Sequence, residues 1–149
     1  MTIPPVECDI LCEDSNWPDI NDNVTSIIRT TLGHIDYTHP CEVSIVLTND
    51  EHIRTLNRDY RGKDKATNVL SFPQDEPEML GDIIIALETI QREANEQNKS
   101  FDNHFTHMLV HGCLHLMGFD HITDDEAEEM ETLEVQILKQ LNIKNPYEI

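Results

Sequence analysis

The stretch FDNHFTHMLVHGCLHLMGFDH, residues 101–121, joins a long apolar pattern to a cluster of histidines. Its apolar residues recur with helical spacing from Phe101 to Met117. The pattern ends at Gly118, a residue type that often follows the last turn of a helix. The sequence therefore predicts a long helix in the core of the fold, with a turn of the chain directly after it.

Three histidines in this stretch are spaced for one metal ion. Residues four apart on a helix lie about 40° apart around its axis and about 6 Å along it, so His111 and His115 project from the same face. Gly118 can adopt the left-handed conformation that turns the chain back, which lets His121 reach the same ion. Three neutral imidazoles leave a fourth tetrahedral position for water, as in a catalytic zinc site. We therefore expect one zinc ion on His111, His115 and His121, which would lower the pKa of its bound water towards about 7.

Other residues of the stretch leave alternatives open. His107 lies one turn before His111 on the same face, so it is a fourth ligand, a partner of a ligand or a core histidine, and we favour the last two. Cys113 lies roughly 200° around the helix from His111 and should face the core.

The histidine spacing is also that of the metzincin proteases, HExxHxxGxxH, but Gly112 stands where those enzymes carry the glutamate that acts as general base. Peptide hydrolysis by their route therefore lacks its proton acceptor.

The rest of the chain alternates between strand and helix patterns. Strands are expected at residues 6–12, 41–47, 67–72 and 80–87, and helices at residues 20–32, 53–60, 88–98 and 127–141. Pro73 is expected to end the third strand, and residues 74–79 are expected to form a loop. The nearly continuous apolar run at 80–87 is typical of a strand buried on both faces.

Side chains that cap helices support this order of elements. Thr48 and Asn49 can cap the second helix, and Thr123 with Glu126 three residues later is the signature of a capping box. Strands interspersed with helices indicate a small α/β or α+β fold with one mixed sheet. We expect one domain, residues 1–149, with the metal site at the end of its core helix.

The composition limits what the chain can bind. Ten Lys and Arg residues against 29 Asp and Glu residues give a net charge of −19, which opposes nonspecific binding to nucleic acid or to an anionic membrane. Half of the ten basic residues lie between Arg54 and Lys65. A local positive patch can persist there, because exposed charges are screened beyond about 8 Å at physiological salt. The segment is therefore either a contact for nucleic acid or a solvated loop.

The sequence also predicts where the protein works. It contains no apolar run of about 18 residues and no signal-peptide pattern at its start, so we expect a soluble, cytoplasmic protein that does not insert into a membrane. The four cysteines include no CxxC pair, and we expect them to be reduced.

Several blocks of the sequence resemble one known family. HGCLHLMGFDH (111–121), YRGKDKATNVLSFP (60–73), LGDIII (80–85) and DDEAEEME (124–131) are similar, in order and separation, to the YbeY family of bacterial ribosomal RNA maturation factors. That family consists of single-strand-specific, metal-dependent endoribonucleases. The resemblance covers most of the chain beyond residue 40.

The resemblance implies a fold, a cofactor and a function. It implies zinc on the three histidines and a mixed four-stranded sheet packed between helices. It also implies a role in 3′-end maturation of small-subunit ribosomal RNA and in ribosome quality control, with the small ribosomal subunit and ribosomal proteins as partners. Arg61 matches the family's arginine in the cavity facing the metal, where a guanidinium would hold a phosphate or neutralise charge during cleavage. The alternative for Arg61 is a surface residue of a basic loop. Asp82, in the apolar strand, is expected to hydrogen-bond the backbone or a ligand histidine.

The sequence is compatible with more than one mechanism and more than one class of function. Zinc hydroxide could attack phosphorus, or the metal could polarise the phosphate while a ribose 2′-hydroxyl attacks. The protein could instead be a ribosome-assembly adaptor whose zinc stabilises the fold. A third alternative is a metal-dependent hydrolase of another substrate, which a cavity without positive charge would favour, since an RNA backbone requires cations along its path.

Overall fold

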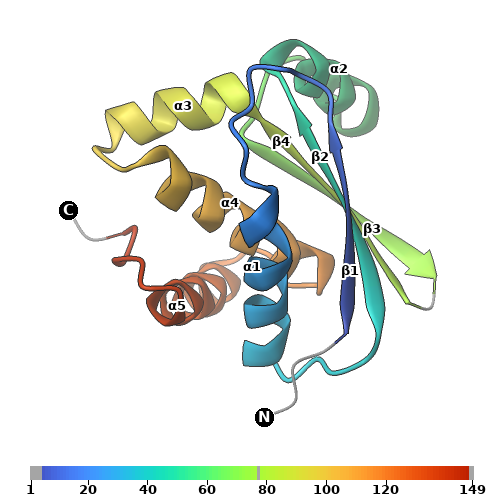
Figure 1. The fold of residues 1–149 in the computed structure, drawn as a ribbon, viewed down its shortest axis with the longest axis vertical. Helices are drawn as coiled ribbons and strands as arrows, with labels where there is room; N and C mark the ends of the chain where they lie inside the picture. The colour runs from blue at the N-terminus through green and yellow to red at the C-terminus, as the bar shows by residue number, and fades with distance from the viewer. Residues whose placement is uncertain (1–4, 77, 148–149) are drawn as a thin grey trace.

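The computed structural model describes residues 5–76 and 78–147, which form a mixed sheet and the helices around it (Figure 1). In chain order the elements are β1 (Val6–Cys12), α1 (Asn21–His34), β2 (Cys41–Thr48), α2 (Asp50–Arg61), β3 (Val69–Glu76), β4 (Met79–Ala86), α3 (Leu87–Glu96), α4 (Phe101–Leu116) and α5 (Asp124–Gln140). The order of strands and helices is the order that the sequence predicts.

The four strands form one mixed sheet in the order β1-β2-β4-β3. β1 runs parallel to β2, and β2 runs parallel to β4, whereas β3 pairs antiparallel with β4. A helix joins β1 to β2, as parallel neighbours require, while β3 and β4 follow each other directly in the chain. The predicted α/β class with a mixed four-stranded sheet is therefore confirmed, and β3 forms one edge of the sheet.

Helices cover both faces of the sheet, as Figure 1 shows. α1 and α4 pack on one face, with α5 on their side away from the sheet, and their apolar side chains form the main core. α2 lies on the other face, where Ile53 packs with Leu70 in a smaller cluster. β4 contributes to both clusters, because Ile83 and Ile85 belong to the main core and Ile84 to the smaller one. The strand at residues 80–87 is thus buried on both faces, as predicted.

Side chains cap the helices where the sequence predicts caps. The Asn49 side chain accepts a hydrogen bond from the backbone N–H of His52 at 2.9 Å, at the start of α2. At the start of α5, Thr123 Oγ1 accepts from the N–H of Glu126, and the Glu126 carboxylate accepts from the N–H of Thr123, each at 3.2 Å. The predicted capping box is therefore confirmed.

β3 is longer than the sequence predicts. Pro73 lies within the strand, opposite Gly81, and the pairing of β3 with β4 extends to Glu76 opposite Met79. The prediction of a strand end at Pro73 was therefore wrong, and so was that of a loop at residues 74–76 and 79; Glu78 lies in a turn, and Pro77 of the predicted loop lies outside the described residues. Because β3 is an edge strand, it has one neighbour only, and a proline without an N–H is tolerated on its free side.

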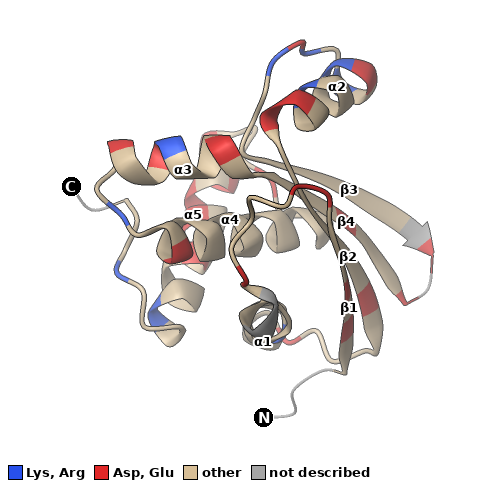
Figure 2. Ribbon diagram, turned by 45° about the horizontal axis from the view of Figure 1, so that its top comes forward, with Lys and Arg blue, Asp and Glu red and all other residues tan. Residues whose placement is uncertain are grey.

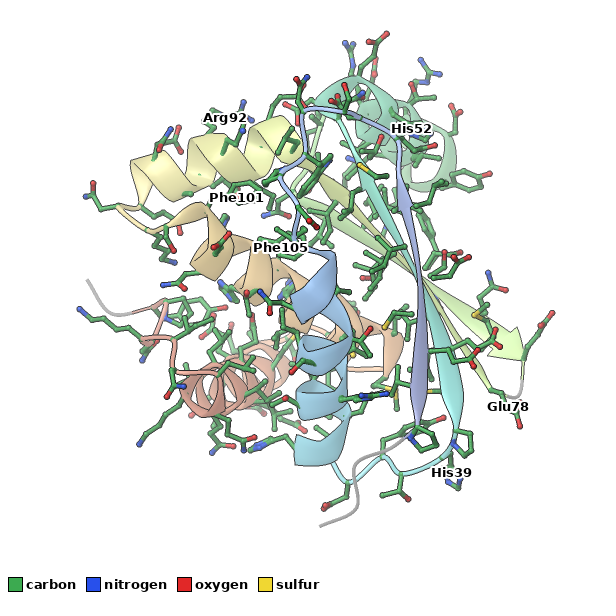
Figure 3. The ribbon with its side chains drawn as sticks, viewed as in Figure 1. His39, His52, Glu78, Arg92, Phe101 and Phe105 are labelled. Carbon is green, nitrogen blue, oxygen red and sulfur yellow. The ribbon has the colours of Figure 1, made fainter. Side chains whose placement is uncertain are left out.

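An aromatic cluster anchors the start of α4 (Figure 3). The ring of Trp17 lies 5.9 Å from that of Phe101 and 5.7 Å from that of Phe105, both in edge-on arrangement. Trp17 Nε1 also donates a hydrogen bond to the backbone oxygen of Thr48 at 2.8 Å, at the end of β2. Each such aromatic pair contributes about 0.5–1.5 kcal/mol beyond its buried area. The helix that carries the histidines is therefore fixed to the end of the sheet.

Within the two described ranges, no helix combines the length and the apolar character that a membrane span requires.

The four cysteines are free thiols. Cys113 of α4 is fully buried in the main core, as predicted, and this burial raises the pKa of its thiol. The thiol is therefore neutral at physiological pH and faces away from the histidine cluster.

Candidate metal centre

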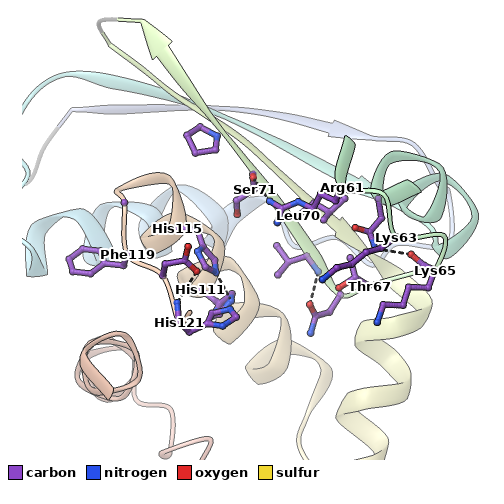
Figure 4. Close-up of a pocket in the computed structure, with 16 residues that line it drawn as sticks. Arg61, Lys63, Lys65, Thr67, Leu70, Ser71, His111, His115, Phe119 and His121 are labelled. Carbon is purple, nitrogen blue, oxygen red and sulfur yellow. Dashed lines mark hydrogen bonds between the residues drawn. The ribbon is translucent and has the colours of Figure 1, made fainter. Parts of the chain in front are cut away.

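α4 and the turn after it bring the three predicted histidines together (Figure 4). His111, His115 and His121 each offer a ring nitrogen, and these nitrogens all lie within 4.8 Å of one another. The Nε2 atoms of His111 and His115 are 3.0 Å apart. Among the His, Cys, Asp and Glu residues whose side chains the structure describes, no other group of three or more is arranged in this way.

The turn after α4 is a Schellman motif that returns the chain to the end of the helix. Gly118 has a φ of +94°, in the region that favours glycine. Its N–H donates to the backbone oxygen of His115 at 3.0 Å, and the N–H of Phe119 donates to that of Leu114 at 3.1 Å. This turn, predicted from Gly118, places His121 beside the two helical histidines.

Gly112 lets α4 lie directly against the sheet. A Cβ atom at this position would lie 2.8 Å from Cγ2 of Ile83 and 3.2 Å from Oγ of Ser71. Ser71 Oγ donates a hydrogen bond to the backbone oxygen of Gly112 at 3.1 Å. The position at which metzincin proteases carry their general base therefore faces the sheet, where a glutamate does not fit. This contact argues against the protease mechanism.

A buried carboxylate that the sequence analysis missed lies behind the cluster. Glu134 of α5 is 1% exposed, and its Oε1 lies 3.2 Å from His111 Nδ1 and 2.6 Å from His107 Nε2. Tyr147 donates its hydroxyl hydrogen to Glu134, with distances of 3.2 Å to Oε1 and 3.0 Å to Oε2. His107 is thus a partner of the same carboxylate as His111, which agrees with one of the predicted alternatives.

The sequence pattern of α5 indicates that Glu134 is buried. On α5 the buried apolar residues Met130, Ile137 and Leu138 recur at helical spacing, and Glu134 stands four residues after the first of them. A carboxylate on the buried face of a helix requires hydrogen-bond partners. His107 and His111 of the neighbouring helix α4 are these hydrogen-bond partners.

Burial favours the neutral forms of His107 and His115, whose pKa values are lowered, while Glu134 is held in its ionised form. Burial alone would raise the pKa of Glu134, but the hydrogen bonds from His107 and His111 outweigh it and lower the pKa to about 2. Burial lowers the pKa of His115, and the neighbouring histidines lower it further. Metal ions bind neutral imidazoles, and ligating histidines commonly donate their other ring N–H to a carboxylate. The donor set and its carboxylate therefore fit a transition metal such as zinc.

The cluster forms one wall of a cavity of about 600 Å³ that basic residues also line (Figure 4). Arg61, Lys63 and Lys65 come from the end of α2 and the loop that follows it. Arg61 Nη2 donates to the backbone oxygen of Ser71 at 3.0 Å, and its guanidinium carbon lies 5.8 Å from the centre of the Phe72 ring. These contacts hold the guanidinium at the edge of β3, in the same cavity as the histidines.

The basic residues of this region differ in their partners. Figure 2 shows Lys and Arg residues grouped at α2 and in the loop after it. Arg54 and Arg58 form ion pairs with neighbouring aspartates at 2.8 and 3.0 Å. In the part of the chain that the structure describes, Arg61, Lys63 and Lys65 form no ion pair. The cavity therefore has positive charge that is available to an anionic ligand, despite the negative total.

Asp82 lies away from the metal cluster. Gly81 and Ile83 face α4, so the alternation of the strand turns Asp82 to the opposite face of the sheet. There it lines a separate cavity with Glu42, and its Oδ2 accepts a hydrogen bond from Gln74 Nε2 at 3.1 Å. The expectation that Asp82 bonds the backbone or a ligand histidine was therefore wrong.

Sequence comparisons agree on one family. The family model described as Endoribonuclease YbeY matches residues 10–142. An Endoribonuclease YbeY of Rhizobium leguminosarum is 58% identical over 161 aligned positions, which cover 96% of this chain and 94% of that protein. An Endoribonuclease YbeY of Nitrobacter winogradskyi is 55% identical over 131 positions, which cover 80% of this chain and 69% of that protein.

A solved structure shares the fold. The solution structure of a Thermotoga maritima protein superimposes with a TM-score of 0.60 at 24% sequence identity, and the match covers 91% of each chain. This likeness concerns the arrangement of strands and helices.

Proposed function

The chain belongs to the Endoribonuclease YbeY family and is a nuclease, and from that premise we propose that it cleaves single-stranded RNA with one zinc ion on His111, His115 and His121. The proposal is supported by the position of the three histidines relative to the basic residues. The three histidine nitrogens, within 4.8 Å of one another, share a cavity with three basic residues that have no carboxylate partner among the described residues. A metal site and a phosphate site are thereby adjacent, as phosphodiester cleavage requires.

Arg61 is the proposed phosphate-binding residue. Its guanidinium already donates one hydrogen bond to the backbone oxygen of Ser71, which fixes its position and leaves other N–H groups free for a ligand. A planar, permanently charged guanidinium binds two phosphate oxygens at once. Arg61 thus orients the scissile phosphate towards the histidines and stabilises the negative charge that develops during cleavage.

The other residues of the cavity have supporting roles in this proposal. Zinc, when bound, supplies a Lewis acid for the phosphate and lowers the pKa of a bound water. The neutral imidazoles of the three histidines bind and orient that ion. Lys63 and Lys65 contact the phosphates that flank the scissile one. Glu134 is 1% exposed and does not line the cavity, so it takes no proton from the substrate.

We further propose that the substrate is ribosomal RNA, with 3′-end maturation of the small-subunit RNA and ribosome quality control in the cytoplasm as the setting. The resemblance of the motifs at 60–73 and 111–121 to ribosomal RNA maturation factors supports this. So does the charge: a chain with a net charge of −19 binds few RNAs indiscriminately. Its substrate is therefore presented by a specific assembly, the small ribosomal subunit with its ribosomal proteins, to the single domain of residues 1–149.

The proposal is tested by measuring zinc content and cleavage of single-stranded RNA on the same preparations. We expect the wild type to bind about one zinc per chain and to cleave. Arg61→Ala should keep its zinc and lose cleavage, whereas His115→Ala should lose both. Arg58→Ala, on the same helix but paired with Asp59, is the matched control and should keep both.

The same experiment separates the alternatives. If the wild type binds zinc without cleaving RNA, and His115→Ala chiefly loses stability in circular dichroism melts, the metal is structural and the adaptor function is correct. If RNA is not cleaved but Arg61→Ala impairs hydrolysis of another phosphodiester, the enzyme is a hydrolase of another substrate.

A further inference from the structure

We propose that Glu134 is the positioning residue of the metal site, and that Tyr147, near the end of the chain, holds Glu134 in place. Glu134 fixes the orientation and the tautomer of His111, so that Nε2 of this histidine faces His115 and His121. The inference rests on the proposed metal site. It adds a carboxylate from α5 and a hydroxyl from the segment after α5 to a site otherwise built from α4 and the turn that follows.

The tautomer of His111 follows from its two neighbours. An ionised carboxylate can only accept hydrogen bonds, so His111 Nδ1, 3.2 Å from Glu134 Oε1, carries the hydrogen. In a neutral imidazole the other nitrogen then carries the lone pair. That nitrogen, Nε2, lies 3.0 Å from His115 Nε2, within the cluster. The contact with Glu134 therefore prepares His111 to bind a metal through Nε2.

Glu134 is itself held in one position. Its side chain is 1% exposed, and His107, one turn before His111 on α4, donates from Nε2 to the same oxygen, Oε1, at 2.6 Å. The Tyr147 hydroxyl lies 3.0 Å from Oε2, and the Tyr147 ring lies 5.6 Å from that of His107. Lys99 Nζ donates to the backbone oxygen of Pro146 at 3.2 Å, which fixes the segment that carries Tyr147. The carboxylate therefore has little freedom to turn away from His111.

A second pair of residues on the same helix provides an internal comparison. His104 of α4 is buried, and its Nε2 lies 2.9 Å from Glu93 Oε1. This pair resembles His107 with Glu134, but neither Glu93 nor His104 contacts His111, His115 or His121 through any hydrogen bond. Glu93→Gln therefore removes the charge of a carboxylate that is hydrogen-bonded to a buried histidine of α4, without touching the proposed metal site.

The test measures zinc affinity by competition with a chromogenic chelator, on full-length protein from which metal has been removed. Outer partners of metal ligands typically change metal affinity about 10- to 100-fold, so we expect a weakening of this size in Glu134→Gln. Tyr147→Phe should weaken zinc binding by a smaller factor, because it removes one of the hydrogen bonds that hold the carboxylate. Glu93→Gln should bind zinc as the wild type does.

A second readout reports on the ligand geometry. In the cobalt-substituted proteins, the visible absorption bands of Glu134→Gln should shift relative to the wild type, while those of Glu93→Gln should not. Loss of stability alone would not move these bands, whereas a misplaced ligand would.

The outcomes distinguish this inference from the function on which it rests. If the wild type binds no zinc, the metal site itself is wrong. If the wild type binds zinc and both Glu134→Gln and Tyr147→Phe bind it equally tightly, the metal site stands and the role of Glu134 is overturned. If Glu134→Gln does not fold, Tyr147→Phe decides: weaker zinc binding supports the role, and unchanged binding overturns it.

Discussion

Gly112 shows how closely the helix that carries the histidines lies against the sheet. A Cβ atom there would lie 2.8 Å from Cγ2 of Ile83, so Gly112→Ala should overfill the contact and lower the free energy of unfolding by about 1–3 kcal/mol. Urea unfolding followed by circular dichroism measures this change. Gly33→Ala is the control, since a Cβ on that helical glycine meets nothing within 4 Å and should stabilise by about 0.5–1 kcal/mol. Equal stability of the two variants would contradict the close approach.

Glu93 should make the free energy of unfolding depend on pH in the acidic range. The hydrogen bond from His104 is the main cause that holds the pKa of Glu93 below its usual value of 4.5. A carboxylate with a lowered folded pKa stabilises the protein above its unfolded pKa, and this contribution is lost as the pH falls through the folded pKa. The wild type should therefore be more stable than Glu93→Gln at neutral pH, and the difference should shrink below about pH 4.5.

Urea unfolding of both proteins between neutral and acidic pH measures that difference. Glu96→Gln, the same substitution at an exposed residue of α3, controls for the loss of a surface charge. A difference between wild type and Glu93→Gln that stays constant over the whole pH range would rule out the proposed linkage.

Which site residues the sequence reveals depends on how far apart they lie in the chain. His111, His115 and His121 share one helix end, so helical geometry and one glycine are sufficient to predict that they meet. Glu134 reaches His111, and Tyr147 reaches Glu134, only because α5 packs on α4 and the chain then turns back. No local spacing encodes that packing. The three histidines were therefore predictable, and their buried partner required the fold.

At the scale of elements, the loop after α2 carries the positive charge of the cavity in a defined shape. Gly62 ends α2 with a φ of +71°, and the buried Asn57 side chain donates to the backbone oxygen of Lys65 at 3.0 Å. Lys63 and Lys65 are thereby held beside the cavity that they line. We expect this loop to be a nucleic-acid contact rather than a freely moving solvated loop.

Replacing both lysines with alanine should weaken RNA binding and reduce its salt dependence. For single-stranded nucleic acid, each phosphate contact contributes about −0.7 to the slope of log K against log salt, so the slope of the double variant Lys63→Ala/Lys65→Ala should be less negative by about 1.4. Fluorescence anisotropy with labelled RNA at several salt concentrations measures the slope. Lys139→Ala/Lys144→Ala has the same change in charge outside the cavity and should keep the wild-type slope. Equal slopes in the two double variants would exclude the loop as a phosphate contact.

The ends of elements were less predictable than the elements themselves. The caps at Asn49 and Thr123 were found from sequence because the side chain and the N–H that it binds lie within three residues of each other. The length of β3 was not, because whether Pro73 ends a strand depends on its place in the sheet. An edge position is a property of the assembled sheet, and the local sequence does not contain it.

The whole molecule places the site at the edge strand β3, where two layers meet. α2 lies on one face of the sheet and α4 on the other, so the chain after α2 and the turn after α4 approach each other across this edge. Arg61 binds the edge itself through the backbone oxygen of Ser71, while Ser71 Oγ binds α4 at Gly112. The mixed sheet therefore serves as the rigid support on which the basic residues and the histidines face one cavity.

We propose that one zinc ion in this cavity enables the protein to cleave single-stranded RNA. The most direct test is to titrate metal-free wild-type protein with zinc and to measure the initial rate of RNA cleavage at each step. We expect no cleavage without metal, a linear rise of the rate with added zinc, and a plateau at about one zinc per chain. Cleavage that persists in the metal-free protein, or that remains absent after one equivalent has bound, would contradict it.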